Sequence, residues 1–163
     1  METQVSSEGS SPSQGALTAF AELNLPSHLT LGRIIAIVEG TRNKPIVIDV
    51  AEWLNGGNLC GLWLSTDSRE IILHAATPSE LHRQQFILHE LGHMVLRHDE
   101  TARPSDYAAL LFPNVDGERV SRILQRSDFF DHIEAAAESM ADLFAAAIRA
   151  STTEPRSFEK ILG

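Results

Sequence analysis

The chain has 163 residues, enough for one domain with a sizeable core and too few for two comfortable ones. Acidic residues outnumber basic ones by 22 to 13, and the net charge of −9 argues against direct binding of nucleic acid and against docking on anionic lipid. The single cysteine, Cys60, excludes an internal disulfide framework and a cysteine-rich zinc module, and it fits a reducing cytoplasm.

The N-terminal third is predicted to contain a loose arm, a helix and a strand. Residues 1–15 are rich in Ser, Gly, Gln and Pro, and we expect all of 1–26 to be a disordered or loosely attached arm. The apolar pattern at 29–39 predicts a first helix. A β-branched run at 45–50 predicts a strand, and 51–54 are expected to add a helical turn.

The middle of the chain predicts a hairpin followed by a long helix. Two apolar segments at 59–64 and 70–74 are separated by a short polar turn, which is typical of a β-hairpin. The sequence TPSE at 77–80 has a capping Thr, a Pro in the first helical position and a Glu three residues after the cap. This capping box predicts a helix that runs to about His98.

A second long helix is predicted at 131–150, where the sequence DHIE repeats the capping pattern. Between the long helices, 107–112 and 118–125 are expected to be short helices, and 151–163 a loose tail. The order of elements predicts an α+β fold in one domain at 27–150: an N-terminal helix, a small three-stranded sheet with a hairpin, and then the two long helices.

The sequence HELGH at 89–93 matches the H-E-x-x-H pattern of zinc enzymes. Residues four apart on a helix have Cβ atoms about 5–6 Å apart, so the imidazoles of His89 and His93 can converge on one ion. Glu90 is rotated about 100° from His89 around the helix axis. It is therefore predicted to face a water on the metal as general base, rather than to be a ligand.

Catalytic zinc requires a third protein ligand, and the predicted helix at 131–150 offers three acidic candidates. Glu134, Glu138 and Asp142 follow one another at intervals of four residues and lie on one helix face. Like charges at this spacing destabilise a helix by a few tenths of a kcal/mol per pair, and a nearby cation would relieve the repulsion. The interleaved alanines would allow the two long helices to approach closely.

Together, HELGH at 89–93 and the segment ESMADLFAA at 138–146 resemble the ImmA/IrrE metallopeptidases, whose second motif reads roughly E-x-x-A-(N/D)-x-F-A-A. The resemblance includes the lead-in segments at 70–73 and 83–88 and spans about residues 30–150. It implies a gluzincin-like protease with a minimal zincin core.

The resemblance also implies a role for each polar residue of the two motifs. One zinc ion per chain would be held by His89, His93 and Glu138. Glu90 would be the general base, and Asp142 would accept a hydrogen bond from a ligand histidine and fix its tautomer.

Three further residues are candidates for stabilising the oxyanion of the transition state: Tyr107, His132 and His98. For each of them a purely structural role is the alternative. The hairpin strand nearest the cleft is expected to bind the substrate as an added strand.

The predicted function is a cytoplasmic zinc endopeptidase. Substrates of the resembled family are typically helix-turn-helix repressors, and this chain contains no convincing helix-turn-helix of its own. The expected partner is therefore a separate DNA-binding repressor, without direct contact to nucleic acid or membrane.

One alternative is a non-catalytic, zinc-stabilised regulator, such as an antirepressor or toxin component, that sequesters its partner. The intact Glu90 argues against this alternative, because a structural zinc site does not need that carboxylate. A second alternative is a zinc hydrolase that acts on a small molecule.

Overall fold

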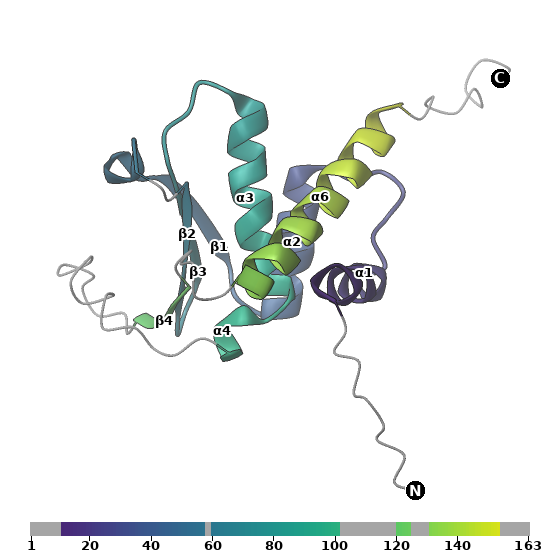
Figure 1. The fold of residues 1–163 in the computed structure, drawn as a ribbon, viewed down its shortest axis with the longest axis horizontal. Helices are drawn as coiled ribbons and strands as arrows, with labels where there is room; N and C mark the ends of the chain where they lie inside the picture. The colour runs from purple at the N-terminus through teal and green to yellow at the C-terminus, as the bar shows by residue number, and fades with distance from the viewer. Residues whose placement is uncertain (1–10, 58–59, 102–119, 125–130, 154–163) are drawn as a thin grey trace, which may run out of the picture.

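Helices cover one face of a small mixed sheet (Figure 1). The computed structural model describes residues 11–57, 60–101, 120–124 and 131–153. The helices are α1 (Pro12–Glu22), α2 (Leu31–Arg42), the 3-10 helix η1 (Glu52–Leu54), α3 (Glu80–Val95), α4 (His98–Thr101) and α6 (Asp131–Thr153). The strands are β1 (Ile46–Val50), β2 (Gly61–Thr66), β3 (Glu70–His74) and β4 (Val120–Leu124). The predicted α+β class is confirmed.

The strands lie in the order β1-β3-β2-β4. β1 is parallel to β3, whereas β2 is antiparallel to both β3 and β4, so the predicted hairpin is present. The short helix predicted at 118–125 is wrong, because 120–124 form β4. The backbone there pairs with β2, and such long-range pairing overrides weak local preferences. The other short helix, predicted at 107–112, lies outside the described residues.

The alternation of side chains divides the sheet into two faces. Trp63 of β2 and Ile72 of β3 are opposite each other in the register and belong to the main core. Helix α3 contributes Ile87, Leu88 and Leu91 to the same core. Residues of the opposite face, including Leu62 and Leu64, form a separate small cluster, and α3 therefore lies against the Trp63 face.

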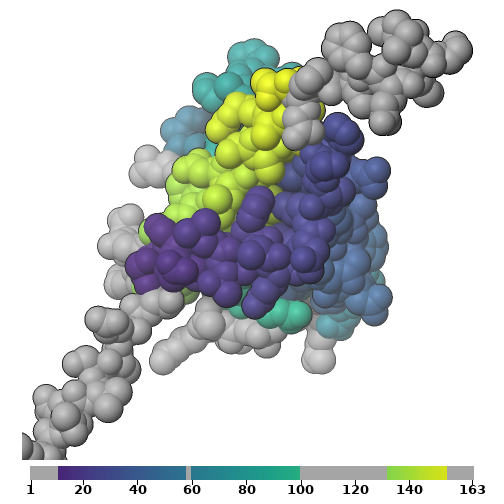
Figure 2. All heavy atoms as spheres, turned by 90° about the vertical axis from the view of Figure 1, so that its right-hand side faces the viewer, coloured from purple at the N-terminus to yellow at the C-terminus, as the bar shows by residue number. Residues whose placement is uncertain are grey.

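The loose arm predicted for 1–26 is corrected, because Pro12–Glu22 form α1. The Ser11 side chain caps this helix, and Ala16 is fully buried in the core. The Phe20 ring lies 5.8 Å from the Phe144 ring of α6. Figure 2 shows α1 lying alongside α6. The arm is thus part of the packed structure from residue 11 onward.

The ends of the long helices differ slightly from the predicted ones. The N-cap of α3 is Ser79, whose hydroxyl accepts a hydrogen bond from the backbone of His82, and Thr77 lies before the cap. Helix α6 runs beyond the predicted end at residue 150, and the hydroxyl of Ser151 accepts a hydrogen bond from the backbone of Leu29. Among the described residues, every helix is too short or too polar to cross a bilayer.

Candidate metal centre

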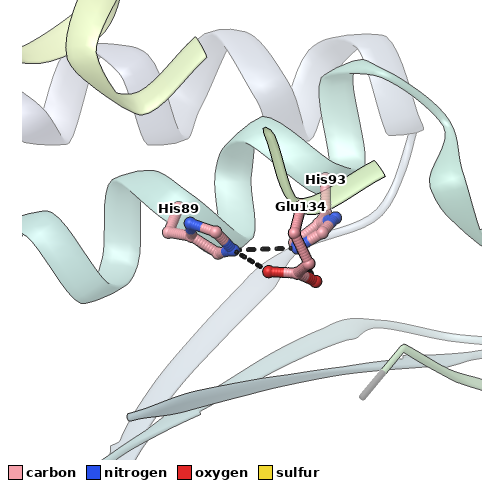
Figure 3. Close-up of side chains that lie close together, drawn as sticks. All are labelled: His89, His93 and Glu134. Atoms are coloured by element: carbon pink, nitrogen blue, oxygen red, sulfur yellow. Dashed lines mark hydrogen bonds and ion pairs between the residues drawn. The ribbon is translucent and has the colours of Figure 1, made fainter. Parts of the chain in front are cut away.

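Two histidines one turn apart on α3 point toward the same place (Figure 3). The Nε2 atoms of His89 and His93 are 3.0 Å apart, and the two rings meet edge to face. Both residues are buried, with exposed fractions of 3% and 1%. The predicted convergence of the two imidazoles is therefore present, and both rings are buried.

A glycine in the motif lets α6 approach this part of α3. A Cβ atom on Gly92 would lie 2.8 Å from the backbone oxygen of Ala137 and 3.3 Å from the Cβ of Met140. Ala137 and Met140 are both fully buried. Because a backbone oxygen cannot move away as a flexible side chain can, only glycine fits here, and the close contact brings the acidic face of α6 to the histidines.

The third side chain at the site is Glu134, from the first turn of α6. One carboxylate oxygen, Oε2, is 3.1 Å from Nε2 of His89, and the other, Oε1, is 3.2 Å from Nε2 of His93. The donor atoms of the three residues all lie within 4.8 Å of one another. Glu134 is thus the acidic residue that the structure groups with the two Nε2 atoms, in the position that the family resemblance implied for Glu138.

Glu138 lies behind the first histidine instead. Its Oε2 is 3.0 Å from Nδ1 of His89, which is the position of a residue that orients a ligand. The resemblance implied this role for Asp142, but Asp142 is exposed and lines a surface groove between α1 and α6. The acidic residue that faces both Nε2 atoms in the structure is therefore one helical turn earlier on α6 than the resemblance implied. The physical reason is that α6 crosses α3, so its acidic face meets the histidines only near its N-terminal end.

Of the three candidates for oxyanion stabilisation, the structure places one at the site. Nδ1 of His98 is 2.8 Å from Nδ1 of His93, so His98 contacts the His93 ring at the nitrogen that does not face His89. Burial, followed by the charge of neighbouring His93, lowers the pKa of His98 to about 4, which keeps it neutral at neutral pH. The side chain of His132 is exposed, and Tyr107 lies outside the described residues.

The contact with Glu138 favours one tautomer of His89 for binding a metal. A carboxylate only accepts, so His89 donates from Nδ1 to Glu138, and a neutral imidazole then carries its lone pair on Nε2. His93 adopts the same tautomer when its Nδ1 donates to His98. In these tautomers the two Nε2 lone pairs and the Glu134 carboxylate face one another and form a donor set that can coordinate one cation.

This donor set fits zinc. Two histidines and one glutamate form a known ligand set of catalytic zinc sites. Tetrahedral ligands at 2.0–2.1 Å from one ion lie about 3.3–3.4 Å from each other. The spacings of His89, His93 and Glu134, 3.0–3.2 Å, are close to that value.

The charge on Glu134 matches this role. Burial alone would raise the pKa of its carboxyl, but hydrogen bonds and charge interactions with His89 and His93 hold that pKa well below its usual range. Glu134 is therefore an anion throughout the neutral range, as a metal ligand must be.

Glu90 follows His89 in α3 and is buried, with an exposed fraction of 1%, but it is not one of the three grouped donors. Its carboxyl group lies against the start of β2: a Cβ atom on Gly61 would be 2.6 Å from Oε1 of Glu90. The absence of a side chain at Gly61 thus provides the space that this carboxyl group occupies. The sequence does not predict this contact between Glu90 and Gly61, because the contact depends on how α3 packs against the sheet.

The chain was compared with protein-family models, with curated proteins and with solved structures, and it matches none of them. The assignment of the site accordingly depends on its own geometry. Within the described residues, that geometry includes both motif histidines and one acidic residue of the predicted second helix.

Proposed function

We propose that this protein is a zinc-dependent endopeptidase of the ImmA/IrrE type. The observation that carries the proposal is the convergence of His89, His93 and Glu134, and Glu90 of the same motif is buried. Both ligand histidines also have a partner on Nδ1, which is typical of metal-binding histidines. A zinc ion held there would acidify water and polarise a carbonyl group.

Other residues of the chain would orient the ligand histidines and transfer protons. Glu138 and His98 contact the two imidazoles at Nδ1, which leaves both Nε2 atoms as the ones that would hold a zinc ion. Glu90 accepts a proton from the attacking water and later delivers it to the leaving amine, as a general acid–base residue does. Its burial against β2 keeps the carboxyl group in one place between these two transfers.

The proposed substrate is a separate DNA-binding repressor in the cytoplasm. The net charge of −9 favours encounter with a basic protein of this kind. The hairpin itself offers no free strand for it, because β2 and β3 are both paired on two sides. Among the described strands, β1 and β4 form the edges, so an extended substrate segment would add there rather than to the hairpin.

The proposal is tested by cleavage of the regulators encoded beside this protein, with mass spectrometry of the products. The zinc-loaded protein is expected to cut one of them. Glu90→Gln keeps the ligand set and is expected to bind one zinc per chain while losing cleavage. His89→Ala is expected to lose both. Continued cleavage by Glu90→Gln would refute the mechanism.

A second variant tests the position of Glu90 without removing it. Gly61→Ala forces the Glu90 carboxyl group to move, because the new Cβ would lie 2.6 Å from Oε1. We expect zinc binding close to that of the wild type and cleavage reduced by about 10²-fold or more, the usual contribution of a general base. Wild-type cleavage by this variant would show that the carboxyl group does not act from this place.

The non-catalytic alternative makes the opposite prediction for Glu90. A regulator that sequesters its partner needs zinc only to hold α3 and α6 together. If Glu90→Gln relieves repression as fully as the wild type, without any cut in the repressor, sequestration replaces proteolysis as the function.

A further inference from the structure

The two ligand histidines are held from behind by different kinds of group. His89 contacts a carboxylate, Glu138, on the long helix α6, whereas His93 contacts a second imidazole, His98, on the four-residue helix α4. A carboxylate has two oxygens with several lone pairs, so it accepts a hydrogen bond from a wide range of directions. His98 accepts at Nδ1 only when its ring faces His93, so the position of α4 decides whether this contact forms.

Helix α4 is tied to the core through the residue that follows His98. Asp99 accepts two hydrogen bonds from the guanidinium of Arg42, at 3.1 and 2.7 Å. The side chains of Arg42 and Asp99 are only 9% and 10% exposed. A parallel pair of charge-assisted bonds fixes orientation as well as distance. The backbone of α4 is thus aligned by a residue at the end of α2.

Arg42 is itself held on its other side by the sheet. Its Nε atom donates to Glu70, which is fully buried, and its guanidinium carbon lies 4.9 Å from the centre of the Trp63 ring. The indole N–H of Trp63 donates to the second oxygen of Glu70. The guanidinium therefore contacts the sheet on one side and Asp99 of α4 on the other.

We propose that Arg42 is a positioning residue of the metal centre, which acts through Asp99 and His98 to hold His93 with Nε2 toward His89 and Glu134. The proposal rests on the proposed function, since it assumes that these residues bind a metal. The competing explanation is that the Arg42 network stabilises the fold and nothing more. The two explanations differ in what they expect when one side of the network is cut.

The test compares two substitutions on opposite sides of the same guanidinium. Asp99→Asn weakens the link to α4 and leaves Glu70 in place, whereas Glu70→Gln weakens the link to the sheet and leaves the Arg42–Asp99 pair. Zinc affinity is measured by competition with a chromophoric chelator, and stability by denaturant unfolding of the zinc-free proteins. We expect Asp99→Asn to weaken zinc binding about 10- to 100-fold, as the loss of a residue behind a ligand does, and Glu70→Gln to leave it unchanged.

Nitrogen NMR of the imidazoles provides a readout that general destabilisation would not move. In zinc-loaded Asp99→Asn, the ring signals of His93 are expected to broaden or shift, while those of His89 keep their wild-type positions. If Asp99→Asn does not fold, Arg42→Lys replaces it, because lysine keeps the charge but cannot make the paired contact. Equal zinc affinity in the wild type and both variants, or equal losses in Asp99→Asn and Glu70→Gln, would overturn the proposal.

Failure of the proposed function gives a different result. If the wild-type protein itself takes up no zinc, the metal centre is refuted and the positioning role with it. If the wild type binds zinc and Asp99→Asn binds it equally well, only the role of Arg42 is refuted.

Discussion

At the scale of single residues, the decisive question is which glutamate of α6 is the ligand. Glu134 faces both Nε2 atoms, and Glu138 faces Nδ1 of His89. Glu138→Gln is therefore expected to weaken zinc binding about 10- to 100-fold, and Glu134→Gln is expected to weaken it further, because a ligand is lost. Both affinities are measurable by chelator competition. A larger loss in Glu138→Gln would instead restore the assignment implied by the family resemblance.

The sequence could define the acidic stripe but not its position along the helix axis. A spacing of four residues places Glu134, Glu138 and Asp142 on one face, whichever of them meets the histidines. The choice depends on where α6 crosses α3, and that point is determined by packing between Gly92 and Ala137. The histidine pair was predictable for the opposite reason, since its geometry lies within a single helix.

At the scale of elements, Gly92→Ala tests the contact between α3 and α6. The new methyl group would meet the backbone oxygen of Ala137 at 2.8 Å, so the helices must separate. We expect a loss of about 1–3 kcal/mol in the free energy of unfolding, the usual cost of overpacking, together with weaker zinc binding.

Gly40→Ala on the exposed face of α2 is the control, because nothing lies within 4 Å of its Cβ position. It is expected to stabilise the protein by about 0.5–1 kcal/mol. Wild-type zinc affinity in Gly92→Ala would contradict this role of the glycine.

The elements that were predicted correctly have strong local signals. α2, α3 and α6 have apolar periodicity, and the strands at 46–50, 61–66 and 70–74 have β-branched and apolar residues between turns. Helix α1 was missed because the polar composition before it concealed the Ser11 cap, and because its stability comes from contacts such as that between Phe20 and Phe144. β4 was missed because it is a strand only through its pairing with β2.

At the scale of the whole molecule, zinc is expected to act as a cross-link. His89 and His93 belong to α3 and Glu134 to α6, so an ion bound by all three joins helices that are separate in the sequence. Binding to the folded state alone stabilises a protein by about 2.7 kcal/mol when free ligand is 100 times its Kd. We therefore expect zinc to raise the Tm of the wild type and of Glu90→Gln, and a chelator to reverse the change. The Tm of His89→Ala is expected to be insensitive to both, and a zinc-dependent rise in that variant would place the ion elsewhere.

The pH dependence of stability should distinguish the effect of zinc from the effect of the contacts that Glu134 makes with His89 and His93. Contacts with His89 and His93 hold the pKa of Glu134 below its ordinary value of 4.5 in spite of burial. A carboxyl group whose pKa is lowered by folding contributes stability above its unfolded pKa and loses it as the pH falls toward the folded one. The zinc-free protein should therefore lose this contribution only below about pH 4.5. Metal ligands bind in their deprotonated form, so the zinc-dependent rise in Tm should decrease as the pH is lowered. Scans with zinc and with chelator at each pH measure the difference, and a zinc effect that does not change with pH would contradict binding through these ligands.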